Sequence, residues 1–294
     1  MKANNYRWPA PAKINLMLHI TGRREDDGYH LLETHFQFID WMDWIDIEIS
    51  DDGVIERVND IPDLPADSDL TIRAAKLLRD TTGTQQGASI AVHKSIPTGA
   101  GLGGGSSDAA TVLVALNEMW DLGLGEADLR ELGLGLGADV PVFIAGHAAF
   151  ATGVGEHLIP LDAPESSILV IFPACHVETR AIFTHSQLTR DTPSIKIHDL
   201  ARVPTRNDCE IVTRALYPPV DEALTWLAQF GDAKMSGTGA SVFALFQSEQ
   251  EAAEIAESCP AHWVARITTC VNRSPLLAAV ENFRQKSDLG NNAS

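Results

Sequence analysis

The sequence predicts an α+β protein with two domains. Its predicted strands and helices follow one another irregularly, without the repeated strand–helix–strand order that builds a doubly wound sheet. A length of 294 residues suits one large domain or two domains of ordinary size. Pro160 and Pro164 interrupt the chain near residues 155–165. We therefore expect one domain over residues 1–160 and a second over residues 161–294.

Hydrophobic periodicity predicts most elements of the first half. Alternating polar and apolar residues indicate strands, and apolar residues at helical spacing indicate helices. The expected strands cover residues 12–20, 33–39, 44–49 and 88–97. A polar turn at residues 40–43 separates the middle two strands. The expected helices cover residues 69–82, 106–120 and about 126–135.

The second half opens on a short apolar run, residues 168–174, which is typical of a buried strand. A glycine turn then leads into a strand within residues 235–246, and a last strand is expected near residues 263–270. The expected helices lie near residues 178–188, 208–216, 219–230 and 249–258. Residues 286–294 are polar, and we expect this tail to be exposed and disordered.

Charge and composition exclude several classes of function. A formal net charge of −18 argues against nucleic acid as a partner, because such binding depends on Lys and Arg contacts to phosphates. No apolar run approaches the roughly 20 residues of a membrane span, and the N-terminus lacks a signal-peptide core. We therefore expect a cytoplasmic protein without a membrane partner. The cysteines form no CxxC pair and the histidines no HExxH motif, so we expect no protein-held metal site.

A glycine-rich loop is the strongest functional signal in the chain. Glycine lets the backbone take positive φ and approach a ligand closely, and successive N–H groups can form an anion-binding nest ahead of a helix N-terminus. This arrangement suits the phosphates of a nucleoside triphosphate. The candidate nucleotide-binding residues are Pro97, Gly99, Gly101, Leu102, Gly103, Gly104, Gly105, Ser106 and Ser107. The two serines could contact phosphate or Mg²⁺, or could cap the following helix.

Three common phosphate loops fit this segment poorly. A Walker A loop requires a lysine after its last glycine, and none is present. Gly99, Gly101 and Gly104 satisfy the dinucleotide pattern GxGxxG, but no strand leads to an acidic residue about 20 positions later. A protein-kinase loop carries a valine where Ser106 stands, and it requires a VAIK strand that this chain lacks.

A fourth type fits. The segment PxxxGLGGGSSDAA resembles the phosphate loop of the GHMP kinase superfamily, which has no lysine and binds phosphate through backbone amides. Residues 11–16, PAKINL, are similar to the first motif of the superfamily, and residues 234–240, KMSGTGA, to the third. The resemblance implies an N-terminal domain like the second domain of ribosomal protein S5 and a ferredoxin-like C-terminal domain. It also implies ATP as a substrate, with Mg²⁺ accompanying it.

Within this superfamily, the segments GYH, GADVPVF, RNDCE and MSGTGASVF resemble the branch that acts on a cytidine diphosphate methylerythritol. This branch phosphorylates the 2-hydroxyl of that small-molecule substrate in non-mevalonate isoprenoid biosynthesis. Ala100 and Asp108 depart from the residues that are common in it. Three other functions stay open: a kinase of homoserine or mevalonate, a catalytically silent sensor with the same fold, and, least favoured, a nicotinamide dehydrogenase.

Asp139 and Lys13 are the candidate catalytic residues. Asp139 lies on a constrained turn between apolar neighbours, where a carboxylate could act as a base or could simply cap a helix. Lys13 lies among apolar residues of a predicted strand, either as a paired ammonium or as an edge lysine that reaches solvent. The resemblance implies that Asp139 is the catalytic base. Lys13, beside it, would keep the carboxylate ionised.

Further residues could hold the two substrates. Asn15 shares a strand face with Lys13 and could hydrogen-bond the substrate. Tyr29 and His30 could stack on a base and read its edge, although such aromatic residues are more often core. The resemblance implies that they hold the cytosine, with Thr179 and Phe183 on its other side. Lys94 could lie close to the nucleotide or be solvated. One more turn could bring backbone amides towards the substrate diphosphate, or it could be a plain turn before a strand. It consists of Gly237, Thr238 and Gly239.

Overall fold

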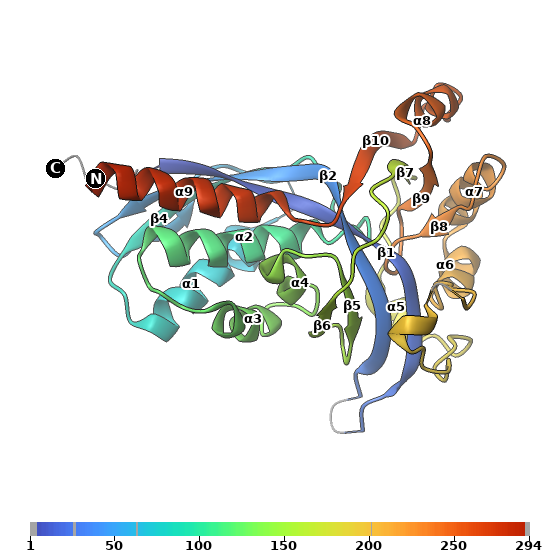
Figure 1. Ribbon diagram of the computed structural model, residues 1–294, viewed down its shortest axis with the longest axis horizontal. Coiled ribbons are helices and arrows are strands. Elements are labelled where there is room, and N and C mark those ends of the chain that lie inside the picture. The colour runs from blue at the N-terminus through green and yellow to red at the C-terminus, as the bar shows by residue number, and fades with distance from the viewer. Residues whose placement is uncertain (1–4, 26–27, 63, 201, 292–294) are drawn as a thin grey trace.

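The computed structural model is an α+β molecule, as predicted, with a ten-stranded sheet and helices packed against it (Figure 1). A long antiparallel pair, β1 (Asn5–Arg23) and β2 (His30–Ser50), runs through both halves of the molecule. The structure describes residues 5–25, 28–62, 64–200 and 202–291.

Strand β2 organises the sheet because it pairs along both of its edges. One edge carries β1 over its whole length. The other edge is divided among β5 (Ala149–Thr152), β10 (Val264–Val271) and β4 (Gly87–His93), all antiparallel to β2. Two short strands extend these pairings, β3 (Ile55–Arg57) beside β4 and β6 (His157–Pro160) beside β5.

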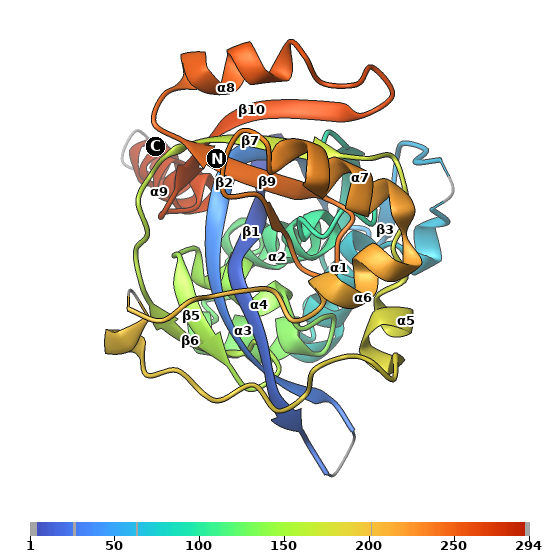
Figure 2. The same cartoon turned by 90° about the vertical axis from the view of Figure 1, so that its right-hand side faces the viewer.

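Strand β10 carries the sheet into the second half of the chain. It pairs with β7 (Ser167–Phe172), which pairs in turn with β9 (Val242–Phe246) and then β8 (Lys234–Met235). Helices α7 and α8 pack against these strands, and the quarter-turn view in Figure 2 places α8 beside β10. The helices and short 3₁₀ turn of this half are α5 (Thr179–Thr184), η2 (Ile197–Asp199), α6 (Glu210–Leu216), α7 (Pro218–Leu227) and α8 (Glu249–Ala256).

The helices of the first half are α1 (Leu70–Thr82), α2 (Gly104–Met119), α3 (Glu126–Leu134) and α4 (Val140–Ala145), after a 3₁₀ turn at Ala66–Ser68. They form one layer, in which α2 contacts both β1 and β2, α1 contacts β3 and β4, and α3 and α4 contact α2. The bounds of α1, α2 and α3 agree within two residues with the helices expected from periodicity over residues 69–82, 106–120 and 126–135, whereas the sequence did not predict α4. None of the helices in the described part of the chain has an apolar stretch that could cross a bilayer.

The prediction of two strands separated by a turn at residues 40–43 is wrong, because β2 runs unbroken through this stretch. Between two successive residues of β1, the paired residues on β2 advance by three, from Ile39 to Met42. The extra residues form a bulge that buries Trp41. Asp43 is fully buried there, and its carboxylate accepts the backbone N–H of Ser95. The polar residues that suggested a turn therefore belong to a bulge within β2, and one of them, Asp43, is a buried hydrogen-bond acceptor.

The expectation of a disordered tail over residues 286–294 is wrong as far as residue 291, because α9 (Pro275–Asn291) continues to that point. Residues 292–294 lie outside the described residues. The helix runs back along β1 and α2, so the end of the chain packs on its beginning (Figure 1). The polar composition of the last residues did not indicate that α9 has an apolar stripe. The buried residues of this stripe are Leu276, Val280 and Phe283.

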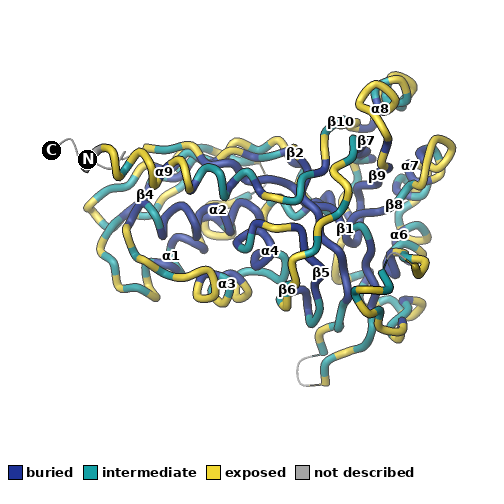
Figure 3. Tube along the Cα trace, viewed as in Figure 1, coloured by how far each residue is buried: buried dark blue, intermediate teal, exposed yellow. Residues whose placement is uncertain are grey.

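Among the described residues, three buried apolar clusters stabilise this arrangement. Figure 3 colours the buried residues dark blue along the trace. The first fills the space between β1, β2, β4 and the helices α1, α2, α4 and α9. The second lies under α6, α7 and α8. The third joins β1 and β2 to β7, β9 and β10, beneath the glycine loop. The division of the chain at residues 160 and 161 stays a prediction.

Replacing Phe283 by Ala should destabilise the protein by about 3 kcal/mol, the usual cost of removing a buried aromatic ring. Phe283 is 3% exposed, and its ring centroid lies 5.4 Å from those of both Tyr6 and Trp8. Urea unfolding of the variant measures this loss. Leu289→Ala, on the same helix at 71% exposure, is the matched control and should change stability by less than about 0.5 kcal/mol. Equal effects from both variants would contradict the placement of α9.

Candidate active site

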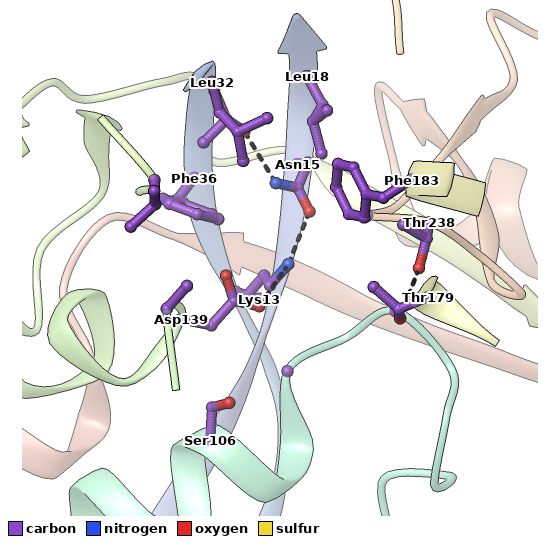
Figure 4. A pocket seen from close by; sticks show the side chains of 16 residues that line it. Lys13, Asn15, Leu18, Leu32, Phe36, Ser106, Asp139, Thr179, Phe183 and Thr238 are labelled. Atoms are coloured by element: carbon purple, nitrogen blue, oxygen red, sulfur yellow. Dashed lines mark hydrogen bonds and ion pairs between the residues drawn. The ribbon is translucent and has the colours of Figure 1, made fainter. Parts of the chain in front are cut away.

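Two neighbouring cavities flank the glycine loop. The first has a volume of about 280 Å³ and is lined by residues from both halves of the chain, including Lys13, Asp139 and Phe183 (Figure 4). The second, of about 410 Å³, is lined by the loop itself together with Lys94 and an apolar wall. Residues that line both cavities are Gly101, Gly103 and Ser106. A ligand bound in one cavity can therefore approach a ligand in the other across this loop.

Two glycines of the loop lie where no side chain fits. Both Gly101 and Gly103 have positive φ, at 76° and 73°. A Cβ on Gly101 would lie 2.3 Å from the carbonyl oxygen of Ser236, and one on Gly103 would lie 2.8 Å from the ring of Phe143. The loop is thus pressed against the 236–239 turn on one side and α4 on the other. The glycine pattern is a packing requirement as well as a phosphate signal.

Helix α2 begins directly after this loop, with Gly103 at its N-cap position and no side-chain cap. Its first N–H groups are consequently available to an anion, and the helix dipole favours negative charge there. Ser106 lines both cavities, whereas Ser107 is fully buried and lines neither. Pro97, Gly99, Leu102, Gly104 and Gly105 line the second cavity.

Lys13 and Asp139 lie together, although 126 residues separate them in the chain. The Nζ of Lys13 is 3.2 Å from Oδ2 of Asp139, and both line the first cavity (Figure 4). Asp139 occupies the N-cap position of α4, but its side chain makes no capping hydrogen bond. Its carboxylate is instead directed to Lys13. Lys13 is 3% exposed, so an edge lysine that reaches solvent is excluded.

Asn15 holds Lys13 in position. Lys13 Nζ donates to Oδ1 of Asn15 at 2.7 Å, and Nδ2 of Asn15 donates to the Thr34 hydroxyl at 2.8 Å. The backbone N–H of Asn15 donates to the Ser236 hydroxyl, which in turn donates to the carbonyl of Gly101. The amide group that was expected to face the substrate is therefore engaged with β1, β2 and the 236–239 turn. Its orientation fixes the ammonium beside Asp139.

Lys94 is neither solvated nor a free cation. Its Nζ donates to Asp43 at 2.5 Å and to Asp108 at 2.7 Å, at the wall of the second cavity. Burial opposes the ammonium charge, but Asp108 and Asp43 outweigh it and raise the pKa of Lys94. Burial also raises the pKa of Asp108 to about 7, against the opposing effect of Lys94 and with a further rise from Asp43. One lysine thus faces two buried carboxylates, and no hydrogen bond from any residue that the structure describes reaches Oδ1 of Asp108.

The 236–239 turn contributes to the first cavity from the second half of the chain. Gly237 and Thr238 line it beside Thr179, and the hydroxyls of the two threonines lie 3.1 Å apart. Gly239 does not line it and instead supports Gly101, since a Cβ on Gly101 would lie 2.6 Å from its carbonyl oxygen.

The candidate base-binding residues are only partly assembled. Phe183 lines the first cavity, and its ring centroid lies 5.1 Å from that of His30. A base stacked between two rings needs about 7 Å, twice the normal contact distance, so none fits between these two as they stand. Tyr29, at 60% exposure, lines neither cavity.

Several residues around the site were not expected from the sequence. Thr34 and Ser236 orient Asn15, and Asn207 donates from Nδ2 to the carbonyls of Met235 and Gly237. Arg190 donates to His30. Asn207 and Ser236 lie in the segments RNDCE and KMSGTGA, which carry the resemblance, but the sequence alone did not indicate their contacts or those of Thr34. Arg190 lies in none of the segments that carry the resemblance.

Replacing Asp108 by Asn should change how stability depends on pH. A carboxyl group whose pKa rises from 3.8 to about 7 on folding binds its proton more tightly in the folded state. Stability is therefore lost as the pH rises from about 4 to about 7. Asn has no carboxyl group to titrate, so the variant does not lose this stability. Its free energy of unfolding should therefore rise relative to that of the wild type between about pH 4 and pH 7, by about 1 kcal/mol or more. Urea unfolding at pH 4.5 to 8 measures it, and a pH-independent difference would contradict the shifted carboxyl.

Comparisons with known proteins agree with this geometry. The family described as GHMP kinases N terminal domain matches residues 69–147, and GHMP kinases C terminal matches residues 195–265. A mevalonate kinase from Methanococcus jannaschii has the same fold, with a TM-score of 0.65 at 16% identity over 93% of this chain and 98% of that one.

Three proteins that are more similar to this chain than the mevalonate kinase are all named as the same kinase. A 4-diphosphocytidyl-2-C-methyl-D-erythritol kinase from Nitrosococcus oceani is 51% identical over 93% of this chain and 98% of its own, and one from Azoarcus sp. is 51% identical over 93% and 96%. A crystal structure of 4-(cytidine 5'-diphospho)-2C-methyl-D-erythritol kinase superposes with a TM-score of 0.78 at 34% identity, covering 90% of this chain and 99% of that one. These matches confirm the resemblance drawn from the motifs. The chain belongs to the 4-diphosphocytidyl-2-C-methyl-D-erythritol kinase family of GHMP kinases.

Proposed function

We propose that this protein transfers the γ-phosphoryl group of ATP to the 2-hydroxyl of 4-diphosphocytidyl-2-C-methyl-D-erythritol, giving the 2-phosphate and ADP in isoprenoid precursor biosynthesis. The observation that carries the proposal is the Lys13–Asp139 pair, which opens into a cavity that shares the glycine loop with a second cavity. The names of the similar proteins supply the substrate.

ATP would occupy the second cavity, with its phosphates over residues 99–107. The wall opposite the loop is apolar and suits a purine base, and its members are Ile61, Leu64, Leu70 and Val92. The uncapped first turn of α2 and the amides of the loop would hold the phosphate oxygens. The terminal phosphate would then point across Gly103 and Ser106 into the first cavity.

Asp139 would act as the base in the first cavity. It would take the proton from the 2-hydroxyl as that oxygen attacks the γ-phosphorus, while the bond to the bridging oxygen of ADP breaks. The Lys13 ammonium would stabilise negative charge on the attacking oxygen and keep Asp139 ionised. Asn15 would act through Lys13, since its side chain is already hydrogen-bonded within the protein.

Mg²⁺ would accompany ATP. Among the described residues, no group of three or more His, Cys, Asp or Glu side chains could hold a metal ion. Mg²⁺ on a nucleotide commonly takes most of its ligands from phosphates and water, so one or two protein oxygens suffice. The Ser106 hydroxyl borders both cavities and fits that requirement. The ion would neutralise part of the negative charge on the phosphates of ATP.

The methylerythritol diphosphate would extend from Asp139 towards Thr179, Gly237 and Thr238, whose polar atoms face the same cavity. Its cytosine would reach the region of Phe183, His30 and Tyr29. Because His30 and Phe183 are too close to enclose a base, we expect the base to stack on the side of Phe183 that lines the first cavity, with His30 at its edge.

Coupled ADP release tests the proposed function. The purified protein, with ATP and Mg²⁺, should turn over the cytidine diphosphate methylerythritol and leave mevalonate and homoserine unchanged. Turnover of either control in place of the cytidine substrate would assign a different kinase activity. ATP binding without turnover of any of the three would favour a catalytically silent sensor.

Asp139→Asn should lower kcat by roughly 10²- to 10⁴-fold, because the amide cannot accept the proton. ATP should still bind with unchanged Kd, since Asp139 does not line the nucleotide cavity. Steady-state kinetics and calorimetric titration with ATP measure the two effects. The matched control is Asp232→Asn, which removes the carboxylate of an exposed Asp–Lys pair, 3.4 Å from Lys234, and should leave kcat unchanged. Undiminished turnover in Asp139→Asn would refute the assignment of the base.

A further inference from the structure

Arg190 links the two sides of the candidate base site. Its Nε donates to Nε2 of His30 at 3.1 Å. Its Nη2 donates to the carbonyls of Phe183 at 3.0 Å and His185 at 2.7 Å, and Nη1 donates to the carbonyl of Leu188 at 3.1 Å. A single guanidinium therefore holds the end of α5, which carries Phe183, against the first residue of β2. No motif in the sequence includes this arginine.

The contact with His30 determines which ring nitrogen carries the proton. A guanidinium can donate hydrogen bonds but cannot accept them, so Nε2 of His30 must be the acceptor. A neutral imidazole with Nε2 as acceptor carries its proton on Nδ1. Among the described residues, no hydrogen bond is made by that Nδ1, so it is available as a donor to a ligand.

Charges around His30 favour the neutral ring. Burial lowers its pKa, and the positive charges of Arg190 and Arg23 lower it further. His30 therefore presents one donor, Nδ1–H, and not the two donors of an imidazolium. Its ring lies 5.1 Å from that of Phe183, which lines the first cavity, although His30 itself does not line that cavity.

A single fixed donor distinguishes the two pyrimidines. N3 of cytosine is a hydrogen-bond acceptor, whereas N3 of uracil carries a hydrogen and is a donor. An Nδ1–H group aimed at this position pairs with cytosine and meets an opposing hydrogen in uracil. An unpaired donor at a binding site costs affinity, so the pairing selects one base against the other.

We propose that Arg190 is a positioning residue that fixes His30 as an Nδ1–H donor and thereby makes the site selective for cytidine over uridine diphosphates. The proposal rests on the proposed function only in taking a cytidine diphosphate group as the ligand. It concerns binding, so CDP and UDP themselves serve as probes.

Two variants of Arg190 separate this role from support of α5. In Arg190→Gln, the amide nitrogen stands in the same place along the side chain as Nε of arginine, so a donor to His30 is retained. In Arg190→Met, a methyl group stands there and no donor remains. Both variants lose the contacts to the carbonyls of Phe183, His185 and Leu188. Any difference between them therefore reports on the contact with His30.

Calorimetric titration measures Kd for CDP and UDP in each protein. The wild type should prefer CDP by at least about tenfold. Arg190→Gln should keep that ratio within about threefold, even if both affinities fall, whereas Arg190→Met should lose most of it. Arg214→Ala removes an arginine bound to Asp221 and Glu210, and as the control it should keep the wild-type ratio. Equal losses in the Gln and Met variants, or no loss in either, would overturn the proposal.

The tautomer can be observed directly in the wild type, which keeps the proposal testable if a variant fails to fold. Nitrogen-15 NMR of histidine-labelled protein, with the His30 signal assigned by its absence in His30→Gln, should show a neutral ring protonated on Nδ1 at pH 7.5. A ring protonated on Nε2, or on both nitrogens, would overturn the proposal. Failure of the proposed function is distinct from this, since it would appear as absent ADP release in a protein that still prefers CDP.

Discussion

A buried ammonium at the crossing of three elements is the constraint on which the rest of the site depends. Lys13 lies in β1, at 3% exposure, and an isolated charge there would be strongly unfavourable. Asp139 at the start of α4 and Asn15 on the same strand compensate it. The backbone N–H of Lys13 donates to the carbonyl of Leu102, so the same residue ties the glycine loop to the sheet. Position, charge and loop geometry are thus set together at one residue. A Cβ on Gly103 would lie 3.1 Å from Cε of Lys13, in addition to its closer approach, at 2.8 Å, to the ring of Phe143.

The continuity of the sheet explains why this site can draw on both halves of the chain. Strand β10 pairs with β2 on one side and β7 on the other, and the apolar cluster beneath the glycine loop includes residues from all three strands. The 236–239 turn therefore meets the loop at a fixed place, where the Ser236 hydroxyl donates to the carbonyl of Gly101. A phosphoryl acceptor in the first cavity would therefore be held at a fixed position relative to a nucleotide on the glycine loop.

Periodicity in the sequence predicted the helices of the first half because their apolar stripes are regular, as in residues 69–82. It failed at the bulge near Trp41 and at α9, where polar residues face solvent or fill special positions inside an element. The meeting of Lys13 with Asp139 depends on tertiary structure, so only the resemblance to a family could suggest it. Arg190 had no such support. Its role depends on carbonyl groups and one ring nitrogen that come together only after folding.

The distribution of charge in the two cavities leaves phosphate binding to the backbone. Among the described residues that line them, the lysines are Lys13 and Lys94, and both are already paired with carboxylates. The carboxylates already offset the charge of each ammonium, so neither lysine offers an unpaired positive charge to a triphosphate. In the proposed function, the amides of the glycine loop and the first turn of α2 would bind the phosphates, together with the Mg²⁺ that we propose accompanies ATP. A protein with a net charge of −18 can bind a polyanion in this way, because the attraction comes from oriented dipoles at short range and does not require a basic surface.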